Sequence, residues 1–418
     1  MSPIRRLTTR RGCVVAGLGV GQILSWGSTF YLLAVLAGPI ATDTGWPVSL
    51  VVAGVSVGLV IAGLGSPRVG TLVAGNHGRT VLVASALLLA LGLAVLGVAP
   101  NQWWYLGAWA ILGAGMSGGL YSGAFAVLGH TYGSSARSAI TLLTLFGGFA
   151  STICWPLSTV LVNELGWRWT ALAYAGAHLL ITAPLYAITI PRRPVAPTPN
   201  SEPPDRNHAV PMPSGPRWLL FALVALVSTL GTSIAALMSI HMFSLLAGIG
   251  IAGTAAVLLA ATIGPSQVGA RFIELVIGRK HHSLWTMLAA TLAMAVAIGF
   301  LGSGFLAPTL LMVVYGVGIG LSSIANGTVP LALFGQEHYA RLMGRIALPS
   351  LLAQAAAPLI GSVLIRDLGQ QNTMIVLGWV ALLALVLALW LMLLHHGKPN
   401  PAAPAAASEP SGLSSYHS

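Results

Sequence analysis

Arg271 and Glu274 stand inside an otherwise apolar stretch, QVGARFIELVIGRK, at residues 267–280. Only 6% of the chain is charged, so two ionic side chains in such a stretch require an explanation. Residues three apart lie on one face of a helix, so the arginine and the carboxylate could pair with each other.

The composition describes the surroundings of these two side chains. Of 418 residues, 56% are hydrophobic, which is too many for a soluble domain, and the 50 glycines favour closely packed membrane helices. The sequence therefore predicts an all-α membrane protein with twelve transmembrane helices. Runs long enough to cross about 30 Å of hydrocarbon are 13–40, 48–67, 80–98, 103–129, 139–163, 170–190, 218–244, 248–269, 284–303, 307–333, 346–366 and 374–396.

The basic residues predict the orientation of the chain in the membrane. The 19 Lys and Arg residues are scattered between the runs, which argues against nucleic acid as a partner. All except Arg168 and Arg366 fall in one alternate set of connections. Because loops rich in Lys and Arg are retained in the cytoplasm, both termini are predicted to be cytoplasmic. The basic and then apolar start resembles a secretory signal, but it lacks a small-residue cleavage site and is interpreted as the first membrane helix.

The two halves of the chain repeat each other. SPRVGTLVAGNHGR at 66–79 matches SQVGARFIELVIGR at 266–279, and Pro156-Leu157 matches Pro358-Leu359. Such duplication is typical of transporters. We therefore expect two six-helix bundles joined by a Pro-rich polar linker. The predicted domains are a cytoplasmic N-terminus at 1–12, bundles at 13–190 and 218–396, a cytoplasmic linker at 191–217, and a disordered cytoplasmic tail at 397–418.

Twelve helices as six plus six, with a Gly-x-Leu-x5-Gly-Arg stretch between the second and third, resemble the major facilitator superfamily. In that stretch Gly70, Leu72, Gly78 and Arg79 fit the family signature, but its Asp position holds Ala74. In the second copy Glu274 stands at that position. The resemblance implies that charged residues at the cytoplasmic helix ends latch the two bundles together. The expected cytoplasmic gate consists of Gly70, Arg79, Arg271, Glu274 and Arg279.

Two other interpretations of Arg271 stay open. Gln267-x-x-x-Arg271 is similar to the acidic-x-x-x-Arg element of helix eight in monocarboxylate and oxalate–formate carriers, in which the arginine meets a substrate carboxylate. An arginine at membrane depth is costly and therefore a candidate for function, although Gln267 replaces the acid here. The third interpretation is a surface pair whose charged ends extend to the membrane interface.

The resemblance also implies that helices one, four, seven and ten line the central path. The titratable side chains deep in predicted helices near neutral pH are His178 and His241. Either could carry a coupling proton, with His241 on a path helix the better candidate, and a hydrogen-bonded packing histidine is the alternative for each. The expected substrate path consists of Gln22, Ser28, Tyr31, Tyr121, Trp155, His241 and Asn326.

These features predict a secondary active transporter, not an enzyme, that moves a small organic solute by alternating access. We place it in a bacterial-type inner membrane, as a monomer in the lipid bilayer with no cofactor and no metal. The expected path lacks Asp, Glu, Lys and Arg, which disfavours cationic drugs and favours a neutral or weakly anionic solute such as a monocarboxylate moved with a proton. An efflux carrier for apolar compounds and a non-transporting membrane receptor remain alternatives.

Overall fold

The computed structural model describes residues 3–192, 216–301 and 306–396, and the described part is helical throughout its length apart from short connections. The predicted tail at 397–418 and most of the predicted linker lie outside these ranges, whereas α1 already begins at Pro3, within the predicted N-terminal stretch. The helices are α1 (Pro3–Gly27), α2 (Leu33–Thr44), α3 (Val48–Leu72), η1 (Val73–His77), α4 (Gly78–Gly97), α5 (Gln102–Gly119), α6 (Tyr121–Tyr132), η2 (Gly133–Ser135), α7 (Ala136–Gly148), α8 (Ala150–Ala177), η3 (His178–Thr182), α9 (Ala183–Thr189), α10 (Pro216–Gly248), α11 (Gly253–Ala261), α12 (Ile263–Ile277), η4 (Gly278–Lys280), α13 (Ser283–Leu301) and α14 (Pro308–His396).

By length and composition, seven continuous helical stretches in the described ranges could cross a membrane. Three of them, of 50, 54 and 88 residues, are far longer than the roughly 20 residues that one crossing needs. Their backbone leaves helical geometry at Gly75 and Asn76, at Gly166, and at Gly335 and Gly369. Each of these breaks falls inside a predicted connection between two runs. The prediction of an all-α fold of membrane-spanning helices is confirmed.

Some predicted runs are interrupted inside the membrane region. The run at 13–40 contains a turn between α1 and α2, and the run at 103–129 contains extended backbone at Leu120 between α5 and α6. At the second break the chain folds closely on itself, because a Cβ at Gly123 would overlap the backbone of Gly118. Glycine permits this approach, and an apolar run by itself does not reveal it.

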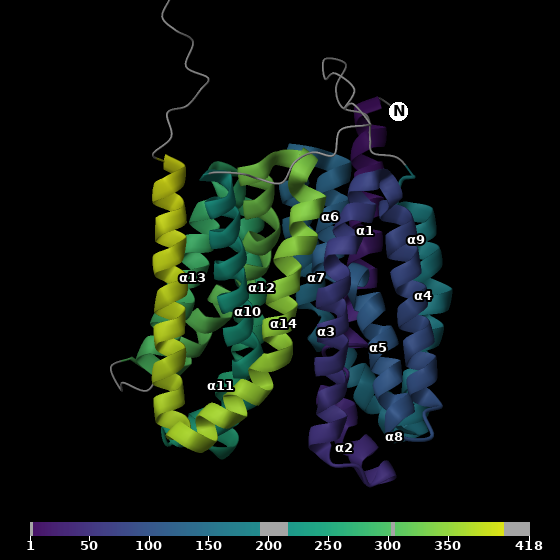
Figure 1. Ribbon diagram of the computed structural model, residues 1–418, viewed down its shortest axis with the longest axis vertical. Coiled ribbons are helices and arrows are strands. Elements are labelled where there is room, and N and C mark those ends of the chain that lie inside the picture. The colour runs from purple at the N-terminus through teal and green to yellow at the C-terminus, as the bar shows by residue number, and fades with distance from the viewer. Residues whose placement is uncertain (1–2, 193–215, 302–305, 397–418) are drawn as a thin grey trace, which may run out of the picture.

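The helices form two groups that each have an apolar core. Figure 1 shows α1–α9 on one side and α10–α14 on the other, with the start of α1 and the end of α14 at the same end of the molecule. This end, where η1, η2 and η4 also lie, is called the basic face below because Arg79, Arg137 and Lys280 are in or beside those connections.

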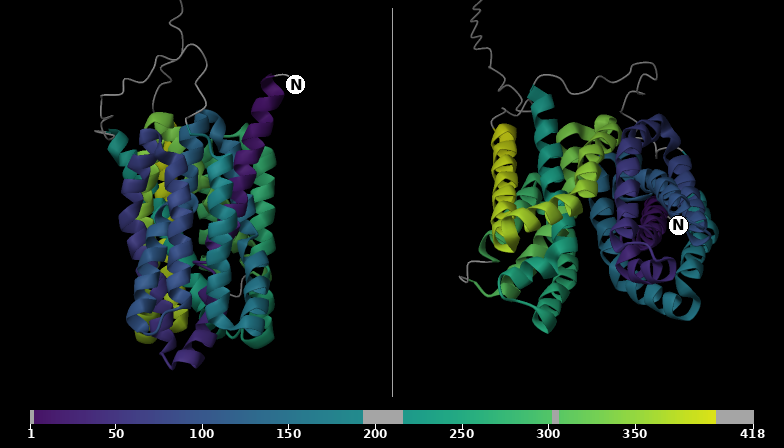
Figure 2. Two further views of the ribbon diagram at one scale, coloured as in Figure 1. Left: turned by 90° about the vertical axis from the view of Figure 1, so that its right-hand side faces the viewer. Right: turned by 60° about the horizontal axis from the view of Figure 1, so that its bottom comes forward.

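The two groups pack together at the basic face and separate toward the opposite end. Leu331, Tyr339, Ala340 and Met343 of α14 are buried within the core of the first group. Further along the same interface, α12 packs against α7 but has no comparable packing against α8 among the described helices. Figure 2 shows the two groups standing apart at the end opposite the basic face.

Candidate functional site

Arg271 lies on α12 at the contact between the two bundles, and its side chain is buried at 4% exposure. Its Nη1 donates to the backbone oxygen of Thr144 on α7, at 3.0 Å. Its Nη2 donates to Ser323 Oγ at 3.0 Å and to Gln267 Oε1 at 3.4 Å, while Nε has no partner. All of these acceptors are neutral, and no carboxylate among the described residues forms an ion pair with Arg271.

Glu274 is also buried, one turn nearer the basic face, and it binds a different set of groups. Its Oε1 accepts from Thr286 Oγ1 at 2.8 Å and lies 3.4 Å from Arg137 Nη2 and 3.3 Å from His281 Nε2. Arg137 also donates to the backbone oxygen of His281. Glu274 therefore joins α12 to the start of α7 in the other bundle.

The expected pairing of Arg271 with Glu274 is wrong. Among the described residues, no ion pair joins the two side chains. The physical reason is that α7 offers each of them a partner across the interface, Arg137 for the carboxylate and the Thr144 carbonyl for the guanidinium.

Sequence reasoning placed Arg137 only among the basic residues of the connections and missed this role. The sequence does contain a repeated pattern here, because Ala136-Arg137 follows Gly133 in the first half and Ala340-Arg341 follows Gly335 in the second.

The remaining gate candidates lie at or near the basic face. Gly70 is buried against α14, where a Cβ would lie 2.5 Å from the Ala340 oxygen, and a Cβ at Gly344 would overlap the backbone of Ser66. Arg79 is half-buried and lines a small hollow with His130 and Arg192. The side chain of Arg279 lies outside the described part of the chain.

Aromatic path candidates of the first bundle extend away from Arg271 through a series of ring contacts. The Tyr121 hydroxyl donates to the Thr144 oxygen at 3.3 Å, so it shares an acceptor with the guanidinium. The Trp26 ring lies 5.1 Å from the Tyr121 ring and 6.1 Å from the Tyr31 ring. The Tyr31 ring meets the Trp155 ring edge-on at 6.0 Å. The structure thus places Tyr121 of the first bundle beside Arg271 of the second, and ring contacts through Trp26 connect Tyr121 to Tyr31 and Trp155.

Comparisons with known proteins decide the family. The model of the Major Facilitator Superfamily matches residues 18–329, which is most of the chain. The chain belongs to the major facilitator superfamily. No curated protein sequence matches it.

Two solved structures have the same fold. The human organic anion transporter MFSD10 (TETRAN) is 19% identical, with a TM-score of 0.71, over 93% of this chain and 100% of that one. The proton:xylose symporter XylE, bound to 6-bromo-6-deoxy-D-glucose, is 13% identical, with a TM-score of 0.67, over 92% and 96%.

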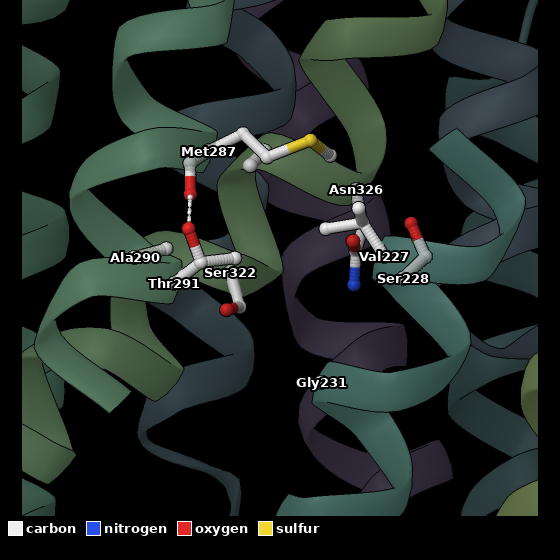
Figure 3. Close-up of a pocket in the computed structure, with 9 residues that line it drawn as sticks. Val227, Ser228, Gly231, Met287, Ala290, Thr291, Ser322 and Asn326 are labelled. Atoms are coloured by element: carbon white, nitrogen blue, oxygen red, sulfur yellow. Dashed lines mark hydrogen bonds between the residues drawn. The ribbon is translucent and has the colours of Figure 1, made fainter. Parts of the chain in front are cut away.

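Other path candidates of this superfamily member have their neighbours within a single bundle. Gln22 Nε2 donates to the Gly119 oxygen at 2.7 Å, and its Oε1 accepts from Trp26 Nε1 at 3.2 Å. Asn326 lines a cavity of about 10 Å³ between α10, α13 and α14, together with Ser228 and Ser322 (Figure 3). That volume is about the space of one water molecule, so this cavity does not hold an organic solute.

The two histidines of this superfamily member also have partners inside their own bundles. His178 Nε2 lies 2.8 Å from Ser28 Oγ, and His241 Nε2 lies 2.9 Å from the Pro358 oxygen. Both contacts agree with the packing alternative, and a role for either histidine as a proton site stays a prediction.

Proposed function

We propose that the chain is a secondary active transporter that moves a small organic anion, a monocarboxylate, by alternating access, and that Arg271 contacts its carboxylate. We infer that the basic face is cytoplasmic, as the distribution of Lys and Arg favours. The observation that carries the proposal is a buried guanidinium, at the interface of two bundles, with neutral acceptors and a free Nε.

Burial of an unpaired arginine is unfavourable in free energy, and a bound anion offsets much of this cost. A charge without a counter-charge in a low-dielectric interior costs several kcal/mol. Hydrogen bonds between a guanidinium and a carboxylate are roughly twice as strong as those to neutral acceptors and are often bidentate. Because Gln267 stands where the carriers that this stretch resembles have an acid, the side chain one turn before Arg271 is neutral and competes more weakly with a substrate carboxylate than an acid would.

The same contacts connect anion binding to movement of the bundles. Arg271 Nη1 holds α12 to the Thr144 oxygen on α7, which belongs to the other bundle. A carboxylate that binds the guanidinium competes with this carbonyl and weakens the hydrogen bond that joins the two bundles. A ligand changes a conformational equilibrium only through such a difference in affinity for the two states. Glu274 and Arg137 form a second tie nearer the basic face, which opening toward that face must also break.

The structural neighbours support the class of protein. One is described as an organic anion transporter and the other as a proton:xylose symporter. At 19% and 13% identity these likenesses establish the fold, and the preference for an anion depends on Arg271.

The test replaces Arg271 by lysine, which keeps the charge but loses the planar fork. Purified protein is screened by thermal shift and in proteoliposomes against acetate, butyrate and benzoate, each beside its amide. We expect the carboxylates to bind and move, the amides not to do so, and Arg271→Lys to weaken carboxylate binding at least tenfold. The matched control is Arg68→Lys at an exposed position.

Carboxylate binding that is unchanged in Arg271→Lys, while the ligand-free protein melts normally, would remove Arg271 from the site. Equal binding of acids and amides would instead argue for a neutral solute.

A further inference from the structure

A chain of four aromatic rings extends from the Arg271 contact along the first bundle. The Trp26 ring lies 5.1 Å from Tyr121 and 6.1 Å from Tyr31, and Tyr31 lies 6.0 Å from Trp155. These rings come from α1, the turn after it, α6 and α8. Four elements thus contribute one ring each to a continuous surface, called the aromatic wall below.

The aromatic wall differs from the aromatic packing inside the bundle. Trp109 and Tyr105 are fully buried at 0% exposure, and the Tyr105 hydroxyl is satisfied by the Val51 oxygen. None of the four rings of the wall is fully buried, and Trp155 is 45% exposed. The four rings of the wall are therefore more accessible to a ligand than Trp109 and Tyr105 are.

The wall and the guanidinium meet at one point. The Thr144 oxygen accepts hydrogen bonds from both Tyr121 and Arg271, so Tyr121 is the ring of the wall that lies next to the guanidinium. A Cβ at Gly148 would overlap Arg271 Nη1, so glycine is what lets the guanidinium lie against α7. Beyond Gly148 the span continues as α8, which has no packing on α12 comparable to that of α7, and Trp155 remains 45% exposed.

We propose that the transported anion is an arylcarboxylate, whose carboxylate binds Arg271 and whose ring lies against the aromatic wall. Aromatic rings attract one another in edge-on or offset arrangements with centroids 4.5–7 Å apart, and Tyr31 and Trp155 of the wall already meet edge-on at 6.0 Å. A saturated ring of the same size has no quadrupole and gains only contact area. This inference rests on the proposed function and adds the chemistry of the other end of the solute.

Three probes separate the two proposals. Benzoate has both a carboxylate and an aromatic ring, cyclohexanecarboxylate lacks the aromaticity, and benzamide lacks the charge. Binding to the purified full-length protein is measured by calorimetry and thermal shift. We expect benzoate to bind at least about threefold more tightly than cyclohexanecarboxylate, and benzamide not to compete.

The variant Trp155→Leu should reduce the affinity for benzoate to that for cyclohexanecarboxylate, and continued binding of cyclohexanecarboxylate shows that the site is folded. The matched control is Trp379→Leu, because Trp379 is 66% exposed on α14 and has no place in the site. It should leave the preference intact.

Equal affinity for benzoate and cyclohexanecarboxylate would overturn the arylcarboxylate inference and leave the proposed transport of an anion standing. Benzamide that binds as well as benzoate would overturn the proposed function itself. Failure of all three probes to bind would also contradict the inference, because a site of this kind must accept the smallest arylcarboxylate.

Discussion

The two bundles meet at the basic face in two places that correspond in the duplicated sequence, and the two contacts are built differently. Between α12 and α7 the contact is ionic, with buried Glu274 beside Arg137 and His281. Between α3 and α14 it is a close approach of backbones, at Gly70 and Gly344. The comparison teaches that corresponding contacts between the bundles are formed by charge in one copy and by shape in the other.

The difference follows from one position of the repeated stretch. The second copy has Glu274 where the first has Ala74, so the first copy has no carboxylate to offer. In its place, the absence of side chains at Gly70 and Gly344 lets α3 and α14 approach until a Cβ would meet backbone atoms. Close packing of small residues is a general way to associate membrane helices. It gives a contact that does not depend on ionisation.

The largest effect is expected where shape alone holds the contact. Gly344→Leu places a side chain against the backbone of Ser66, which cannot move aside as a flexible side chain can. The basic face should fail to close, and transport should be lost.

The measurement is the distance between spin labels at Thr71→Cys and Glu337→Cys, both exposed positions, in a Cys13→Ser background. The control is Gly269→Leu, because a Cβ at Gly269 meets nothing within 4 Å. A distance distribution that is the same in Gly344→Leu and the parent would mean that the glycine contact is not what closes this face.

A moderate effect is expected where charge holds the contact. Glu274→Gln keeps the shape but removes the charge that Arg137 and His281 face. Hydrogen bonds to charged groups contribute roughly 1.5–3 kcal/mol, so the ratio of the closed to the open state should fall about tenfold or more. Turnover should slow, because the cycle spends less time in the state closed at the basic face, while ligand affinity stays within a few fold.

Transport kinetics in proteoliposomes measure both quantities, with exposed Glu337→Gln as the matched control. If Glu274 and Arg137 act through their contact with each other, the double variant Glu274→Gln with Arg137→Gln should have nearly the same turnover as Glu274→Gln alone. A large loss of ligand affinity with intact turnover would place Glu274 in the binding site and not in the contact that closes the basic face.

Hydropathy and the positions of basic residues predicted much of the fold. The backbone breaks at Gly166, Gly335 and Gly369 fall in predicted connections, because the end of an apolar run and a turn-forming glycine coincide there. The break at Leu120 was not predicted, because it lies between apolar residues and depends on how closely two turns approach. Apolar runs report which segments enter the membrane and contain no information on irregular backbone within it.

The site was predictable only in its components. An arginine and a carboxylate in an apolar run indicated function, and the aromatic candidates Tyr31 and Tyr121 were named on the basis of the superfamily resemblance. Which groups face each other could not be predicted, because the partner of Glu274 is set by which face of α7 meets α12. Tertiary packing decides that, and the spacing of residues within one helix does not.

The smallest effect is expected from Ala74→Asp, which gives the first copy the carboxylate that the superfamily signature has there. Ala74 is half-buried one turn beyond Gly70, and the Arg341 backbone lies beside Gly70 across the interface. An added ion pair at a partly exposed position contributes up to about 1 kcal/mol, and Arg341 already has another interaction, so the gain is a fraction of that. The spin-label distance between α3 and α14 should narrow slightly and turnover should fall slightly, whereas His77→Asp, an equal charge at an exposed position of η1, should change neither. A longer mean distance or a broader distance distribution in Ala74→Asp would show that the contact between α3 and α14 has no room for a carboxylate. Charge and close backbone packing would then be mutually exclusive ways to form the two contacts between the bundles.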